Sequence, residues 1–183
     1  MAKALVPLAE GFEDIEAVTI IDVLRRGGVN VVTAAVADAL EVKSAHGVVM
    51  LADALFEDVA AADYDVIVIP GGPGTDNLIR NESLKERLVR QKESGGLLAA
   101  ICAAPLVLTN AGVVDPELHV TCYPTCAPGL DRPRAEAPVV EDGAVITGEA
   151  PGSALLFSLV VLKALQGEEA ASRVAQGMVT DVL

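Results

Sequence analysis

The chain has 183 residues, of which 52% are hydrophobic and 21% charged, so it can bury a core and is expected to form one domain over 1–183. Asp and Glu outnumber Lys and Arg by 26 to 13, which gives a formal net charge of −13. This balance argues against nucleic acid and anionic membranes as partners, because both bind basic surfaces. Aromatic residues make up only 3% of the chain, so platforms for base stacking are not expected.

The sequence lacks the features of an exported or membrane protein. Its N-terminus has no apolar stretch of signal-peptide length, and no uninterrupted apolar run reaches the roughly 18 residues of a transmembrane helix. We therefore expect a cytoplasmic protein. The three cysteines, Cys102, Cys122 and Cys126, are too few for a disulfide scaffold and lack the further ligands of a zinc site. No metal and no cofactor are expected.

Short apolar runs alternate with amphipathic stretches along the chain, which indicates strands alternating with helices. In chain order we predict a strand at 4–8, a helix at 13–26, a strand at 29–35, a hairpin of 40–43 and 48–51, a strand at 64–69, a helix at 83–94, a strand at 96–101, a helix at 105–110, strands at 119–123 and 144–147, and helices at 153–165 and 168–178. Continuous apolar strands are typical of a parallel sheet covered on both faces. Ligands bind beyond the carboxyl ends of such strands, where we find the loops 9–15, 70–76 and 102–105.

The helix predicted at 13–26 is apolar almost all round. Its apolar residues are Ile15, Ala17, Val18, Ile20, Ile21, Val23 and Leu24. A helix with this pattern is buried on every side. One face would pack on the sheet, and a second subunit is the economical cover for the other. The sequence therefore predicts a homodimer.

Cys102 stands where the apolar strand of GGLLAAICAAP ends, and Pro105 then permits a helix to begin. This order resembles the strand–nucleophile–helix elbow of hydrolases. Backbone N–H groups and the positive end of the helix would favour the thiolate of a nucleophilic cysteine. The alternative interpretation is that Cys102 serves as a small buried hydrophobe.

Two further features flank this cysteine in the predicted fold. Gly71 and Gly72 follow the strand DVIVIP, where backbone N–H groups could hold an oxyanion or could simply form a tight turn. Glu16 shares a helical face with Ile20, so its carboxyl could be buried, stay protonated and move a proton. Alternatively, Glu16 is one of several first-turn acids that favour the helix dipole, as Glu13 is.

The motifs ALVPLAEGFEDIEA, DVIVIPGG, LLAAICAAP and EAPGS, in this order, resemble the ThiJ/PfpI superfamily. They are most similar to the branch that holds the parkinsonism-associated protein deglycase and its bacterial YajL-type relatives. The resemblance implies a flavodoxin-like three-layer α/β sandwich with a mostly parallel sheet, and a homodimer. It also implies an oxidation-prone nucleophile at Cys102, a protonated glutamate at Glu16, oxyanion-type donors at Gly72 and Ala103, and a pocket acid at Glu13.

Several positions depart from the pattern of the superfamily. Tyr123 stands where many relatives carry a histidine, and Ala103 stands where the peptidases have the histidine that follows the cysteine, so a Cys–His peptidase is not expected. His46 replaces an arginine that reaches the partner subunit's pocket. Glu149 replaces an Arg or Gln shortly before Pro151 of the pocket. With both rim charges altered, anionic substrates should bind less well.

The remaining histidine and thiols have two interpretations each. His119 is predicted to share a strand face with Tyr123, and we interpret it as a surface residue at the end of a strand rather than a base. Cys122 and Cys126 are either ordinary thiols near a loop or partners that resolve an oxidised Cys102 by forming a disulfide.

The resemblance leaves two functions open, both in defence against carbonyl or oxidative stress. In the first, Cys102 attacks a small aldehyde such as methylglyoxal, or a glycated substrate, and Glu16 moves protons to convert the hemithioacetal toward a 2-hydroxy acid. In the second, the protein is a redox sensor or protective protein, and oxidation of Cys102 to sulfenic and sulfinic acid is itself the function.

Overall fold

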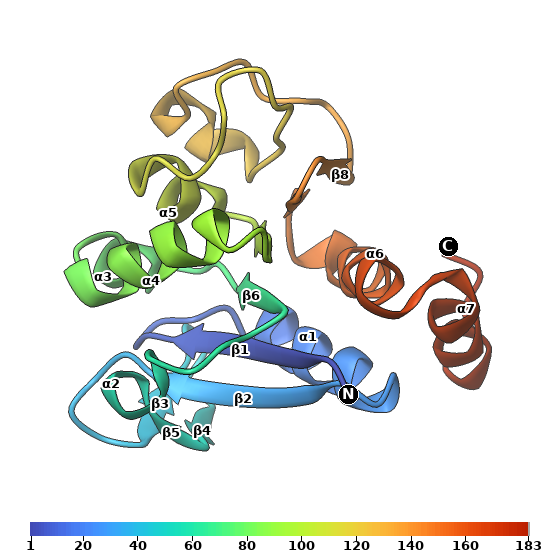
Figure 1. Cartoon of the computed structure of the whole chain (residues 1–183), viewed down its shortest axis with the longest axis horizontal. Coiled ribbons are helices and arrows are strands. Elements are labelled where there is room, and N and C mark those ends of the chain that lie inside the picture. Colours follow the sequence, from blue (N-terminus) through green and yellow to red (C-terminus); the bar gives the residue numbers. More distant parts are fainter. Residues whose placement is uncertain (183) are drawn as a thin grey trace.

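The centre of the fold is a seven-stranded sheet with the strand order β5-β2-β1-β6-β7-β9-β8 (Figure 1). The computed structural model describes residues 1–182. The strands are β1 (Lys3–Leu8), β2 (Asn30–Ala35), β5 (Ala54–Leu55), β6 (Val66–Ile69), β7 (Leu97–Ile101), β8 (Val139–Asp142) and β9 (Val145–Gly148). Neighbouring strands run parallel except for the pair of β8 and β9. The carboxyl ends of β1, β6, β7 and β9 therefore meet at one edge of the sheet.

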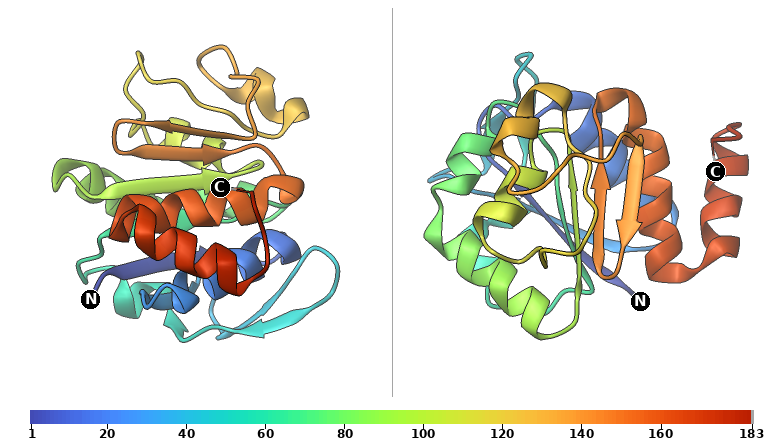
Figure 2. Two further views of the ribbon diagram at one scale, coloured as in Figure 1. Left: turned by 90° about the vertical axis from the view of Figure 1, so that its right-hand side faces the viewer. Right: turned by 90° about the horizontal axis from the view of Figure 1, so that it is seen from above.

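Helices cover both faces of this sheet. On one face lie α1 (Asp14–Arg26) and α6 (Ala154–Gln166), with α7 (Glu168–Gly177) packed outside α6 (Figure 2). On the other face lie α2 (Phe56–Val59), α3 (Thr75–Ile79), α4 (Glu82–Glu93) and α5 (Pro105–Asn110). Two 3-10 helices, η1 (Pro124–Gly129) and η2 (Pro151–Ser153), lie in the connections that follow α5 and β9. Within the described residues, none of the helices has the length and hydrophobicity needed to cross a membrane.

Alternate residues of each central strand enter different cores. In β6, Val66 and Val68 pack in the core under α1 and α6, whereas Ile67 and Ile69 pack in the core under α2 to α5. All four side chains are fully buried. Because both faces are covered, both sets of side chains must be apolar, which explains the uninterrupted apolar run in the sequence. The expected three-layer, flavodoxin-like α/β fold is therefore confirmed.

The predicted hairpin is also present, as β3 (Glu41–Lys43) and β4 (Val49–Leu51) in an antiparallel pair. It is tied to the loop after β1, because the N–H of Gly11 donates to the carbonyl of Lys43 and the N–H of Ala45 donates to the carbonyl of Phe12, each at 2.8 Å. These bonds bring the hairpin turn with His46 to the beginning of α1.

Helix α1 is not buried on every side within one chain. Ile15 is 58% exposed and Val18 is 50% exposed, while Ile20 and Leu24 are fully buried between the sheet and α6. The prediction that a second subunit covers the exposed face remains a prediction.

The predicted strand at 119–123 is wrong. Only an isolated bridge between Val120 and Arg134 forms there. The neighbouring N–H groups have other partners, since Thr121 donates to the side chain of Thr147 and Tyr123 donates to the carbonyl of Cys102. The chain then turns into η1. The sequence analysis also missed β5, α2, α3 and β8, which span two to five residues each and are too short to show a period.

Candidate active site

Cys102 forms a tight elbow between β7 and α5. Its φ is 63°, in the left-handed region that non-glycine residues seldom adopt. Two backbone hydrogen bonds hold it there: its N–H donates to the carbonyl of Gly148 at 3.0 Å, and its carbonyl accepts from the N–H of Tyr123 at 2.8 Å. Backbone strain of this kind persists only where the surroundings impose it, and it is common at functional sites.

The loop after β6 passes so close to this elbow that it needs glycine. A Cβ on Gly71 would stand 2.8 Å from the Cβ of Cys102 and 2.9 Å from the nitrogen of Ala103. Gly72 has a φ of +92°, and a Cβ there would stand 2.5 Å from the carbonyl oxygen of Gly11. The two glycines thus allow a backbone N–H to approach the sulfur.

Glu16 lies beneath the sulfur, on the first turn of α1, and is fully buried. Its Oε2 accepts a hydrogen bond from the N–H of Gly71 at 2.7 Å, and its carboxyl interacts with the thiol of Cys102. Burial raises the pKa of this carboxyl to about 7, against the opposing effect of the Gly71 hydrogen bond. The carboxyl can therefore hold or release a proton near neutral pH.

The thiol of Cys102 is 8% exposed and strongly favours its proton. Burial, followed by the charge of the Glu16 carboxylate, raises the pKa of Cys102 to about 12. Backbone N–H groups of Ala103 and Gly72 act in the opposite direction as donors to the sulfur. These donors favour the thiolate, as expected from the sequence, but burial and the Glu16 carboxylate outweigh them. The two groups titrate as a pair, and the thiolate becomes accessible when the proton resides on Glu16.

A cavity of about 450 Å³ opens above this pair. It is lined by Glu13, His46, Gly72, Pro73, Thr75, Asp76, Cys102, Ala103, Leu106, Tyr123, Cys126 and Pro151. The three loops predicted at the carboxyl edge of the sheet all contribute to it. Of the residues predicted for the site, Gly71 and Glu16 are absent from the lining; Gly71 lies close against Cys102, and Glu16 interacts with its thiol.

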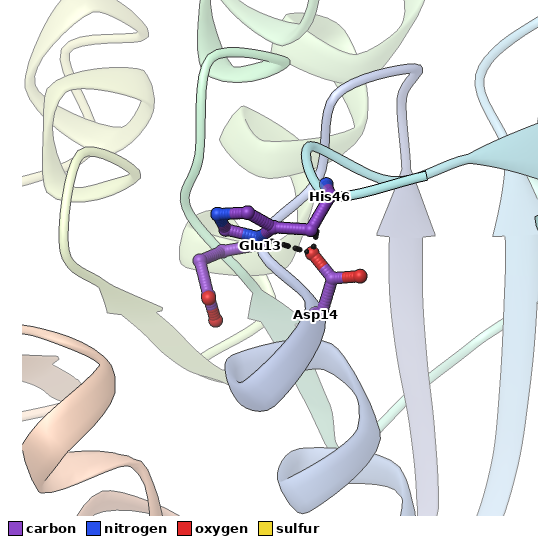
Figure 3. Close-up of side chains that lie close together, drawn as sticks. All are labelled: Glu13, Asp14 and His46. Carbon is purple, nitrogen blue, oxygen red and sulfur yellow. Dashed lines mark hydrogen bonds and ion pairs between the residues drawn. The ribbon is translucent and has the colours of Figure 1, made fainter. Parts of the chain in front are cut away.

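The beginning of α1 is fixed by side chains at the mouth of the cavity. Oε2 of Glu13 accepts from the N–H of Glu16 at 2.8 Å and caps the helix. The imidazole of His46 faces Asp14, with 2.8 Å between Nδ1 and Oδ2 (Figure 3). Ser44 donates its hydroxyl to the other oxygen of Asp14. His46 thus lines the cavity of its own chain.

Glu13, Asp14 and His46 also bring one potential metal ligand atom each to within 4.8 Å of one another. However, both oxygens of Asp14 accept hydrogen bonds, and Nδ1 of His46 is engaged by Asp14. The arrangement is fully explained as a clamp between the hairpin turn and α1.

The sequence analysis wrongly placed one acid, Glu149, at the rim of the cavity, and it missed some residues of the cavity wall. Glu149 does not line the cavity; it pairs with Arg134, which also donates to the carbonyl of Cys122 at 2.8 Å. The missed wall residues include Thr75 and Asp76 of α3, which lie within the predicted loop 70–76 but carry no motif.

The other predicted polar residues divide between the cavity and the surface. Cys126 lines the cavity, whereas Cys122 is fully buried and its thiol donates to the carbonyl of Tyr123. His119 is exposed and pairs with Asp142 at 2.9 Å, outside the cavity lining.

These features define a class: a flavodoxin-like α/β protein with a cysteine elbow, a buried carboxyl beside the sulfur and backbone donors above it. The sequence model of the DJ-1/PfpI family matches residues 2–164, and the chain belongs to this family. Protein dj-1beta of Drosophila melanogaster is 41% identical over 180 residues, with 96% of both chains covered.

Two further comparisons agree with this assignment. A Caenorhabditis elegans relative, named glutathione-independent glyoxalase DJR-1.2, is 37% identical over 163 residues, with 87% of this chain and 86% of that protein covered. The structure of oxidised Toxoplasma gondii DJ-1 superposes with a TM-score of 0.95 at 37% identity and covers 98% of this chain and 99% of that chain.

Proposed function

We propose that this protein is a cofactor-independent enzyme of the glyoxalase or deglycase type, acting on methylglyoxal-type aldehydes in carbonyl stress defence. The observation that carries the proposal is the pairing of a buried carboxyl, Glu16, with the elbow thiol of Cys102 under a cavity large enough for a small dicarbonyl. The glyoxalase name of the C. elegans relative supports the same reaction class.

In the first step, Cys102 attacks the aldehyde carbon. The thiol proton passes to the Glu16 carboxylate as the carbon–sulfur bond forms, because the carboxyl interacts with the thiol and its pKa is near 7. The electron pair of the carbonyl bond moves onto oxygen, and the N–H groups of Gly72 and Ala103 hold the developing oxyanion. Return of the proton from Glu16 to this oxygen gives a neutral hemithioacetal.

In the second step, Glu16 moves a proton between the two carbons of the adduct. Its carboxylate removes the C1 proton of the hemithioacetal to give an enediolate, the proton of the C1 hydroxyl passes to the C2 oxygen, and the Glu16 carboxyl returns its proton to C2. The product is a thioester of the 2-hydroxy acid. Attack by water then releases lactate from a methylglyoxal adduct and regenerates the Cys102 thiol. The sequence requires one water molecule and no oxidant, metal or nucleotide.

A second candidate function rests on the position of Cys102 as a cavity-lining thiol hydrogen-bonded by backbone donors. Hydroperoxides would oxidise its thiolate to sulfenic and then sulfinic acid, and a protonated Glu16 would donate a hydrogen bond to the sulfinate. In this redox-sensor function, oxidation rather than turnover carries the signal.

We further propose a cytoplasmic homodimer. The exposed apolar side chains of α1 and the hairpin, Ile15, Val18, Val48, Val49 and Leu51, would form its interface, since such patches are typical of contact surfaces. All three cysteines are unpaired, as is usual in reducing compartments. Sedimentation equilibrium of the wild type and Val18→Asp tests the dimer: the variant should shift to monomer, and a monomeric wild type contradicts the proposal.

Methylglyoxal consumption with lactate detection tests the enzymatic function. We expect Cys102→Ser and Glu16→Gln each to lower turnover at least about 100-fold, the size typical of losing a nucleophile or proton carrier, while Glu93→Gln, at an exposed position at the end of α4, retains it. Wild-type turnover no higher than that of Cys102→Ser, together with rapid oxidation of Cys102 by peroxide, would favour the redox-sensor function instead.

A further inference from the structure

The cavity above Cys102 is lined by acids without a matching base. Glu13, which caps α1, and Asp76 of α3 both line it, and neither forms an ion pair within the described part of the chain. Of residues 1–182, no lysine or arginine lines the cavity. Its one basic side chain, His46, is bound to Asp14, so its charge is compensated even when the imidazole is protonated.

The two carboxylates are placed to act on a ligand in the cavity. Glu13 is 8% exposed, and its charge reaches Glu16 beneath the sulfur. One of its oxygens caps α1, while the other accepts no hydrogen bond from the described residues. The charge of Asp76, in turn, acts on the thiol of Cys126, which lines the same cavity. The cavity that Cys102 lines therefore carries two further carboxylates in its walls.

The chemistry of the same walls suits a positive group. The aromatic ring of Tyr123 replaces an imidazole base at the mouth and attracts cations through its π face. Thr75 adds a hydroxyl that is buried without a hydrogen-bond partner beside Asp76. A carboxylate or phosphate on the substrate would meet two carboxylates and gain no cationic partner, which is a repulsive element of specificity.

We propose that this site selects carbonyl compounds by charge: it accepts neutral and ammonium-bearing aldehydes, rejects carboxylate- and phosphate-bearing ones, and uses Asp76 as a specificity-determining residue. That the ligand carries a carbonyl group rests on the proposed function. The charge preference does not, because it follows from the residues that line the cavity. A single charge within a few ångströms of a ligand in a partly solvated site changes affinity by roughly tenfold or more, so the combined preference of two carboxylates should be easy to measure.

The test uses charged thiol reagents at Cys102, which need no turnover. In a Cys126→Ser background we would measure labelling rates with the cationic 2-(trimethylammonio)ethyl and the anionic 2-sulfonatoethyl methanethiosulfonates, map the modified residue by peptide mass spectrometry, and divide by the rates of free 2-mercaptoethanol. We expect a cation-to-anion ratio of at least about tenfold that persists in 0.5 M NaCl, where the general field of the acidic surface is screened.

Matched variants separate the local effect from net charge. Asp76→Lys should lower the ratio at least about fivefold, whereas Glu93→Lys should leave it within about twofold. Glu93 is exposed and ends α4, just before the amino end of β7 and so at the opposite edge of the sheet. A ratio near one in the wild type, or equal changes in both variants, would overturn the inference.

The rate at which charged aldehydes are consumed provides a second test. An aldehyde that bears an ammonium group should be consumed faster than glyoxylate, which bears a carboxylate. Asp76→Lys should reduce the ratio of these two rates. If no aldehyde is consumed but the labelling ratio holds, the proposed carbonyl chemistry fails while the charge preference stands. If methylglyoxal is consumed and the labelling ratio is near one, the charge preference fails while the proposed carbonyl chemistry stands.

Discussion

Oε2 of Glu16 accepts a hydrogen bond from the backbone N–H of Gly71 at 2.7 Å. The other oxygen of this carboxyl is buried and has no hydrogen-bond partner in the described chain, and the carboxyl interacts with the thiol of Cys102. The loop after β6 thereby positions a proton acceptor from α1 against a nucleophile from β7.

Glu16→Gln should change thiol reactivity and turnover in opposite directions. The carboxylate is the second cause, after burial, of the pKa of about 12 at Cys102, so its removal lowers the thiol pKa and speeds alkylation at pH 8. We expect iodoacetamide to label Cys102 at least roughly fivefold faster in the variant, since one pKa unit changes the thiolate fraction tenfold. Slower labelling in Glu16→Gln than in the wild type and in Glu93→Gln would show instead that Glu16 promotes the thiolate as a donor.

The same residue predicts a pH dependence of stability. Burial raises the pKa of Glu16 from 4.5 to about 7, so between these values the folded state binds more protons than the unfolded state. The free energy of unfolding must then fall as pH rises from 4.5 to 7, by up to about 3 kcal/mol. Carboxylates with lowered pKa values, such as Asp14 and Asp53, change the free energy of unfolding only at pH values below the range of 4.5 to 7.

Urea unfolding at pH 5 and pH 7.5 measures this effect. The wild type should lose about 2–3 kcal/mol more between the two pH values than Glu16→Gln, which has no proton to release. Equal losses in the two proteins would mean that the Glu16 carboxyl ionises in the folded state as it does in the unfolded chain.

The sequence could predict the sheet, its helices and the edge that holds the site, because strands buried on both faces must be continuously apolar. Local patterns also offered Cys102 and Glu16 as candidates, each with an alternative interpretation, and the resemblance to the family then favoured the site. The sequence could not predict the residues of the cavity walls. Asp76 lies on a helix of five residues, which is too short to show a hydrophobic period. Glu149 forms an ion pair with Arg134, which is distant in the sequence. The failed strand at 119–123 shows the same limit, because its N–H groups bond to distant residues that no local pattern reveals.

Arg134 should stabilise the wall that carries Tyr123. Its side chain is 14% exposed, pairs with Glu149 and donates to the carbonyl of Cys122. Arg134→Met removes both contacts and leaves a half-buried carboxylate and a carbonyl unpaired, so we expect a loss of about 1–3 kcal/mol in the free energy of unfolding. Glu149→Gln keeps the bond to Cys122 and should lose less. Urea unfolding compares the two, and a larger loss in Glu149→Gln would contradict this account.

Gly71→Ala tests the close approach of the loop to the elbow. The new methyl group would stand 2.8 Å from the Cβ of Cys102 and 2.9 Å from the nitrogen of Ala103, so either the loop or the strained elbow must move. We expect a cost of about 1–3 kcal/mol, as for other overpacked sites, and faster alkylation of a displaced Cys102.

Gly177→Ala is the matched control for this substitution. Gly177 ends α7, and a Cβ there would meet no atom within 4 Å, so the added methyl group should be neutral or stabilise by up to about 1 kcal/mol. Thermal unfolding and iodoacetamide labelling of both variants give the comparison. If Gly71→Ala matches Gly177→Ala in both measurements, the elbow tolerates a side chain at position 71, and the requirement for glycine beside Cys102 is refuted.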